Sequence, residues 1–146
     1  MTSSPKIVIY EDSFSDFSSR YGELITIPET RAIIVKTSFD GLESWDDFKA
    51  EFDEDVRDSK YDPKRIHAID DRDILTHEIL QADIYFCDGL NDGYYYIMSR
   101  VPKDKFVLNS GVSGARNHVV SLGGRALNDE RVTIQMLEML LRGDFR

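Results

Sequence analysis

The order of short apolar runs along the chain is the feature that most constrains its fold. Residues 6–10 (KIVIY) and 82–87 (ADIYFC) are rich in β-branched and aromatic side chains, and both runs stop abruptly at acidic residues. Residues 105–109 (KFVLN) form a third run, which ends at Ser110. Short apolar runs of this kind are typical of strands that are buried on both faces of a parallel sheet.

Amphipathic patterns between these runs predict helices. Apolar residues recur at spacings of three and four from residue 42 onwards: Leu42, Trp45, Phe48, Phe52 and Val56. This pattern predicts a helix whose opposite face is acidic and solvated. A closing helix is expected over residues 128–142, with Asn128 or Asp129 as its cap and Gly143 as its stop. Shorter helices are expected over residues 70–81 and 94–100.

The remaining β-rich segments complete the expected topology. Residues 23–27 and 32–37 are joined by a turn-forming segment and predict a β-hairpin. Residues 65–69 and 117–122 predict two further short strands. Strands that alternate with helices imply right-handed crossovers. We therefore expect an α/β fold with a mainly parallel, doubly wound sheet in a three-layer sandwich, and with an inserted hairpin.

Composition limits both the size and the partners of this fold. The chain has 146 residues, of which 41% are apolar, and shows no repeat or linker, so a single domain over residues 1–146 is expected. The chain has 18 basic and 27 acidic residues, and the resulting net charge of −9 disfavours general nucleic-acid binding. A basic protein partner or a bound cation suits that charge better. The sequence has neither a signal peptide nor an apolar run that could span a bilayer, so we expect a cytoplasmic protein without membrane contact.

Polar residues follow three of the predicted strands at the point where each strand ends. Glu11 and Asp12 follow the first run, Asp88 follows the run at residues 82–87, and Ser110 follows the run at residues 105–109. Doubly wound sheets bind ligands outside the carboxyl ends of their strands. Carboxylates that gather there repel one another unless a hard cation neutralises them, and Mg²⁺ prefers such oxygen ligands. The sequence therefore predicts a metal site made by Glu11, Asp12 and Asp88.

This arrangement resembles the receiver domain of bacterial response regulators, which has a flavodoxin-like fold. Residues 7–12 (IVIYED) look like the first receiver strand with its acidic pair, and residues 82–89 (ADIYFCDG) look like the third strand with its phosphorylated aspartate. Residues 106–111 (FVLNSG) look like the fourth strand. The resemblance implies that Glu11 and Asp12 hold Mg²⁺, that Asp88 accepts a phosphoryl group, and that the Ser110 hydroxyl turns to bond the new phosphate.

The chain also departs from the receiver pattern. Receivers carry a lysine at the end of the fifth strand, whereas residues 121–125 read SLGGR, where Arg125 is the candidate positive charge. Asp12 and Asp88 are also further apart in the chain than in the family. The resemblance therefore implies an insertion or a rebuilt segment at about residues 14–56.

These observations favour a stand-alone receiver-like signalling domain, either phosphorylated at Asp88 or acting as a pseudo-receiver that regulates a protein partner. The only catalytic activity expected of such a domain is the transfer of a phosphoryl group onto its own aspartate. The alternative is a small acidic inhibitor or immunity-type protein that masks a basic site on a target. Two glycine-rich segments, residues 110–116 and 123–125, leave nucleotide binding open. Residues 82–93 are also faintly similar to nucleoside deoxyribosyltransferase-like folds.

Overall fold

A six-stranded parallel sheet forms the centre of the molecule. The computed structural model describes residues 4–37 and 43–143. Its strands are β1 (Ile7–Glu11), β2 (Thr30–Lys36), β3 (Ile66–Asp70), β4 (Ile84–Cys87), β5 (Phe106–Asn109) and β6 (Arg125–Leu127). Every neighbouring pair is parallel, and the strand order is β3-β2-β1-β4-β5-β6. The expected doubly wound parallel sheet is thus confirmed.

The strand order fixes where a ligand site can lie. Without β3, the remaining five strands have the flavodoxin-like order 2-1-3-4-5. β3 adds an edge strand beside β2, so the complete order is 3-2-1-4-5-6. In both descriptions the order reverses between β1 and β4. Ligand sites of such sheets lie at this reversal, outside the carboxyl ends of the strands.

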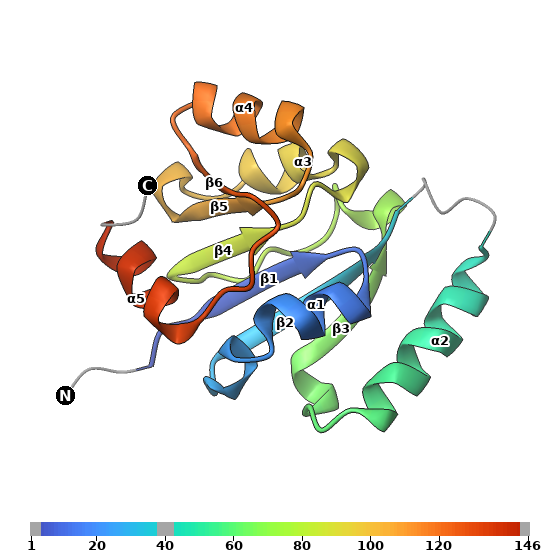
Figure 1. Cartoon of the computed structure of the whole chain (residues 1–146). Helices are drawn as coiled ribbons and strands as arrows, with labels where there is room; N and C mark the ends of the chain where they lie inside the picture. Colours follow the sequence, from blue (N-terminus) through green and yellow to red (C-terminus); the bar gives the residue numbers. More distant parts are fainter. Residues whose placement is uncertain (1–3, 38–42, 144–146) are drawn as a thin grey trace.

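Helices cover both faces of the sheet (Figure 1). They are α1 (Phe14–Tyr21), α2 (Trp45–Asp58), α3 (Tyr94–Met98), α4 (Ser113–Ser121) and α5 (Ile134–Arg142). Ile7 and Ile9 of β1 pack in one core with α1, α2 and α5. Val8 and Tyr10 pack in a second core with α3 and α4. Successive residues of a strand point to opposite faces, which is why one apolar run supplies both cores.

Side-chain caps determine where three of the helices begin. Ser13 accepts a hydrogen bond from the Asp16 amide at 3.2 Å and starts α1 directly after β1. Ser44 starts α2 and Thr133 starts α5 in the same way, each at 3.1 Å. Each such cap satisfies one of the amides that a first helical turn leaves unpaired. The helix expected from Leu42 therefore begins at Trp45, and Leu42 itself lies outside the described residues.

The predicted hairpin is wrong. Leu24–Thr26 is a 3₁₀ turn, and the strand that follows it, β2, pairs in parallel with β1 and β3. The apolar residues Leu24 and Ile25 are buried as part of the turn instead. Periodicity could not separate these alternatives, because a run of only a few apolar residues fits a buried turn as well as a strand.

Three further expectations near the ends of elements are corrected. The helix expected over residues 70–81 is only a 3₁₀ turn at Asp71–Asp73, followed by irregular chain. The strand expected over residues 117–122 is instead the end of α4 with its C-cap Leu122, because Ala115 and Val119 lie one helical turn apart and both face the sheet. Thr133, and not Asn128 or Asp129, caps the closing helix. Within the described residues, no helix is both long and apolar enough to cross a membrane.

Candidate functional site

The structure brings together the three carboxylates that the sequence singled out. Glu11 is the last residue of β1, Asp12 follows it, and Asp88 follows the neighbouring strand β4. One carboxylate oxygen from each residue lies within 4.8 Å of the others. The cluster therefore sits at the reversal of strand order, where a doubly wound sheet places its ligand site.

Glu11 is the most deeply buried member of the cluster. Its side chain is fully buried, and its Oε1 accepts a hydrogen bond from the Asp12 amide at 3.1 Å. Burial and the adjacent Asp88 carboxylate raise the pKa of Glu11 well above its ordinary value, although Arg20 opposes this effect. Glu11 therefore holds a proton more readily than an exposed glutamate does.

Asp88 lies at the mouth of the site. Its Oδ2 accepts a hydrogen bond from the Leu90 amide at 3.1 Å. Burial and the Asp12 carboxylate raise the pKa of Asp88 to about 6. The loop that follows holds Leu90, Asn91 and Asp92 at φ values of 51°, 50° and 71°, a left-handed conformation that costs energy for residues other than glycine. Backbone strain is thus concentrated beside the carboxylates.

Arg20 of α1 is the cation of this site. Its Nη1 lies 2.9 Å from Oε2 of Glu11 and 3.6 Å from Oδ1 of Asp88. Its Nη2 forms an ion pair with Asp129, which follows β6. One guanidinium therefore joins the ends of β1 and β4 to the loop that leads into α5.

A second set of contacts holds that loop in place. The Asn109 side chain at the end of β5 bonds both the amide and the carbonyl of Glu130, at 2.9 and 2.8 Å. Its amide nitrogen also lies 3.1 Å from the hydroxyl of Tyr21. The Val132 amide donates to the Arg20 carbonyl at 2.8 Å. The acidic site is consequently connected through α1 and this loop to the start of α5.

An open cleft of about 370 Å³ lies over the cluster. Asp12, Arg20, Asp88, Ser110 and Asp129 are among the residues that line it. The buried Ser110 hydroxyl accepts a hydrogen bond from the Val112 amide at 3.1 Å. A Cβ atom at Gly89 would lie 3.4 Å from Ser110 Oγ, so the loops after β4 and β5 approach closely. Ser110 therefore lies in the same cleft as Asp88, as the sequence predicted.

Arg125 does not reach this site. It is the first residue of β6 and so lies at the amino end of the parallel strands, opposite the cleft. Its guanidinium donates to the carbonyls of Leu140 and Asp104. The two glycine-rich segments are separated in the same way, because Ser110 and Gly111 line the cleft whereas Gly124 precedes β6. A single phosphate pocket built from both segments is therefore ruled out.

Sequence reasoning missed Arg20 and Asp129. Arg20 follows the buried residue Phe17 by three positions, so it lies next to the inner face of α1, and this spacing was a usable signal. Asp129 has a φ of 56° and follows a strand of only three residues, which the sequence pattern placed elsewhere. The position of Asp129 could not be predicted without the correct end of β6.

The donor set suits a small, hard cation. Carboxylate oxygens on opposite sides of Mg²⁺ are about 4.2 Å apart, and those around Ca²⁺ are about 5 Å apart. The spacing of the three oxygens, within 4.8 Å, is therefore one that a single ion spans with little movement of the side chains. Glu11, Asp12 and Asp88 could hold a metal ion.

Comparisons with known proteins identify no relative of this chain. No protein-family model matches the chain, and neither a curated protein nor a solved structure is significantly similar to it.

Proposed function

We propose that this chain is a receiver-like switch domain: the strand-end carboxylates bind Mg²⁺, Asp88 accepts a phosphoryl group, and a protein partner recognises the result. The observation that carries this proposal is the convergence of Glu11, Asp12 and Asp88 to within 4.8 Å at the reversal of strand order. Gathering three carboxylates at one buried edge is costly unless a cation shares the site.

Glu11, Asp12 and Asp88 would hold the cation. Bound there, Mg²⁺ would neutralise both the carboxylates and the oxygens of an approaching phosphoryl group. Asp12 is partly exposed and lines the cleft, whereas Glu11 is fully buried. Asp12 would therefore hold the ion from the side of the cleft, and Glu11 would hold it from the protein interior.

Asp88 is the nucleophile in this proposal. Its side chain lies in the cleft, and with a pKa of about 6 it is mainly ionised at neutral pH. Its Oδ1 attacks the phosphorus of a small phosphodonor such as acetyl phosphate. A new oxygen–phosphorus bond forms as the donor's oxygen–phosphorus bond breaks, and the acetate that leaves takes the bonding electron pair.

Arg20 and Ser110 would receive the new phosphoryl group. Arg20 Nη1 already lies 3.6 Å from Asp88 Oδ1, so its guanidinium is placed to bond the added oxygens. Doing so would weaken its ion pair with Asp129 and release the loop before α5. The Ser110 hydroxyl lies in the same cleft and can rotate from the Val112 amide towards the phosphate. A protein partner would detect these movements.

The direct test uses the intact protein with acetyl phosphate and Mg²⁺. Intact-mass spectrometry should show one hydroxylamine-labile phosphoryl adduct that requires Mg²⁺ and is absent from Asp88→Asn. Asp104→Asn is the matched control, because Asp104 is exposed and lies at the opposite edge of the sheet. An unmodified protein under these conditions, or an adduct that persists in Asp88→Asn, would contradict the proposal and leave the acidic inhibitor as the better reading.

A further inference from the structure

A groove between the start of α1 and the inner side of α2 borders the acidic site. Its volume is about 230 Å³, and Asp12 lines both this groove and the cleft over the carboxylates. Its apolar lining comes from Phe14, Ile34, Phe48 and Phe52. Phe14 and Phe48 are half-buried, so part of each aromatic ring is open to a ligand. The volume is below the range of about 300–1,000 Å³ that is typical of small-molecule sites, so the groove suits a single inserted side chain.

Carboxylates form the polar lining of this groove. Glu51 and Asp55 of α2 lie one helical turn apart, and Asp12 and Glu43 also line it. Within the described part of the chain, no basic residue lines the groove, and Asp12, Glu51 and Asp55 form no ion pair. Burial and the neighbouring carboxylates, Glu51 first, raise the pKa of Asp55. A cation in the groove would offset this repulsion between like charges.

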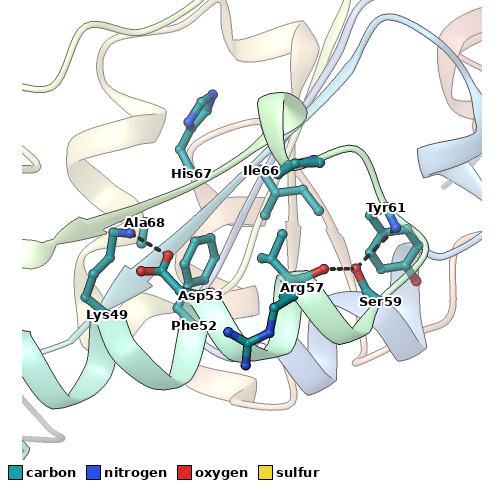
Figure 2. A pocket seen from close by; sticks show the side chains of 11 residues that line it. Lys49, Phe52, Asp53, Arg57, Ser59, Tyr61, Ile66, His67 and Ala68 are labelled. Atoms are coloured by element: carbon teal, nitrogen blue, oxygen red, sulfur yellow. Dashed lines mark hydrogen bonds and ion pairs between the residues drawn. The ribbon is translucent and has the colours of Figure 1, made fainter.

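The cleft on the opposite side of α2 has a different charge (Figure 2). It lies between α2 and the edge strand β3, and its volume is about 620 Å³. Lys49, Arg57 and His67 line it, and Asp53 is the only acidic residue among its described lining residues. Asp53 is already paired, because its Oδ1 lies 2.5 Å from Lys49 Nζ. Of these two clefts, only the groove beside α1 therefore combines unpaired carboxylates with open aromatic surface.

We propose that the groove between α1 and α2 binds an arginine side chain of a partner protein. A guanidinium group is planar and carries its N–H donors in a fork, so it can donate to the carboxylates of Glu51 and Asp55. Its flat face would contact the open parts of the Phe14 and Phe48 rings. A lysine ammonium group has neither the fork nor the flat face.

The charge of the whole chain favours a basic partner over a second copy. Each copy carries a net charge of −9, so two copies repel each other, whereas a basic segment is attracted. The partner would lie beside the acidic site, because Asp12 belongs to both clefts. The proposal involves neither a bound metal nor a phosphoryl group and does not depend on the proposed switch.

The test uses the full chain and a synthetic peptide, acetyl-Gly-Ser-Arg-Ser-Gly-amide, without Mg²⁺ or a phosphodonor, so that its failure is distinct from failure of the switch. NMR titration should shift the amide signals of residues 12–15 and 48–55 and leave those of residues 66–68 unchanged. Citrulline in place of arginine keeps the shape and removes the charge, and should weaken binding at least about fivefold. Lysine in place of arginine should weaken it at least about threefold.

Two variants separate the groove from a general charge effect. Glu51 lines the groove, whereas Glu54 is exposed on the same helix and lines neither of the two clefts beside α2. Glu51→Gln should weaken binding of the arginine peptide at least about threefold, and Glu54→Gln should weaken it less than about 1.5-fold. Phe48→Leu keeps an apolar side chain but removes the aromatic ring, and should weaken binding at least about twofold.

Several results would overturn the proposal. Equal effects of Glu51→Gln and Glu54→Gln would show attraction to the overall charge only. Equally tight binding of the citrulline or lysine peptide would exclude recognition of a guanidinium group. Shifts confined to residues 66–68, absence of binding, or self-association of the chain through this groove would exclude the site or its occupant.

Discussion

The guanidinium of Arg20 lies 2.9 Å from the carboxylate of Glu11, and the Glu11 side chain is fully buried. A buried carboxyl group requires a hydrogen-bond partner, and here the donor comes from α1, the helix that directly follows the strand of Glu11. The same guanidinium reaches Asp88 and Asp129. A single cation on α1 therefore offsets the repulsion among acidic residues from three separate strand ends.

Removing the Arg20 charge should strengthen divalent-cation binding. A cation at Glu11, Asp12 and Asp88 would be repelled by the guanidinium, so Arg20→Gln should bind Mn²⁺ at least about tenfold more tightly than the wild type. Arg20→Lys keeps the charge, and its affinity should stay within about threefold of the wild type. Electron paramagnetic resonance of free Mn²⁺ measures both.

Arg20→Gln should also lower the yield of the phosphoryl adduct, because Arg20 is the proposed ligand of the new phosphate. Arg131→Gln is a suitable control, since Arg131 is exposed and its contact with Glu23 lies at 3.7 Å. Weaker Mn²⁺ binding by Arg20→Gln would show that Arg20 supports the cation site and does not compete with it.

Asp88→Asn should stabilise the fold at neutral and alkaline pH. The folded-state pKa of Asp88 is about 6 against an ordinary value of 3.8, so the folded protein binds the proton more tightly than the unfolded chain does. The protonated Asp88 side chain therefore stabilises the fold fully below pH 3.8, and this stabilisation is lost as the pH rises to about 6. After allowance for the partial exposure of Asp88, the ionised group costs about 1–2 kcal/mol.

Urea denaturation at about pH 4 and pH 8 measures this effect. Asp88→Asn should be more stable than the wild type at pH 8 and nearly equal to it at pH 4. Asp104→Asn should show no such pH-dependent gain. If Asp88→Asn were destabilised equally at both pH values, the Asp88 carboxylate would stabilise the fold, and the prediction that its ionised form destabilises the fold would be wrong.

The convergence of Glu11, Asp12 and Asp88 could be predicted from the sequence because each follows an apolar run. The end of a buried parallel strand places the next polar residue at one edge of the sheet whatever the details of the packing. The position of Ser110 after β5 followed from the same argument. The core strands and the layers were predictable for this reason.

The residues that connect the site to the rest of the molecule were not predictable in this way. Arg20 reaches the cluster only because Phe17 and Tyr21 pack into the core and so fix the rotation of α1. The position of Asp129 depends on β6, a strand of three residues with only one buried side chain. Arg125 was misplaced because residues 117–122, apolar enough for a strand, form the second half of α4 and its C-cap.

Cation affinity should rise with pH. Asp88 and Glu11 both have raised pKa values, so at low pH they carry protons that a cation must displace. Mn²⁺ affinity should be at least about tenfold weaker at pH 5 than at pH 8, since Asp88 with a pKa of about 6 gains a proton across that interval. Calorimetric titration in buffers of different ionisation enthalpy should show proton release on binding. Affinity that did not change over this interval would place the cation on other ligands.

Asn109 should be the most sensitive polar residue near the site. It is fully buried, and its amide group bonds Tyr21 and both backbone groups of Glu130. Asn109→Ala would leave these groups unpaired, which should lower the free energy of unfolding by about 2–4 kcal/mol. Asn117→Ala, on the exposed side of α4, should change it by less than about 0.5 kcal/mol.

Loss of Asn109 should also loosen the loop that carries Asp129, because the Glu130 contacts hold that loop against β5. Hydrogen exchange should then become faster at the amides of residues 130–134 while those of β1 stay protected. Arg20 would keep its contact with Glu11, but its ion pair with Asp129 would be weaker. Asn109→Ala with unchanged exchange in this loop would show that Arg20 and Val132 hold it without the help of Asn109.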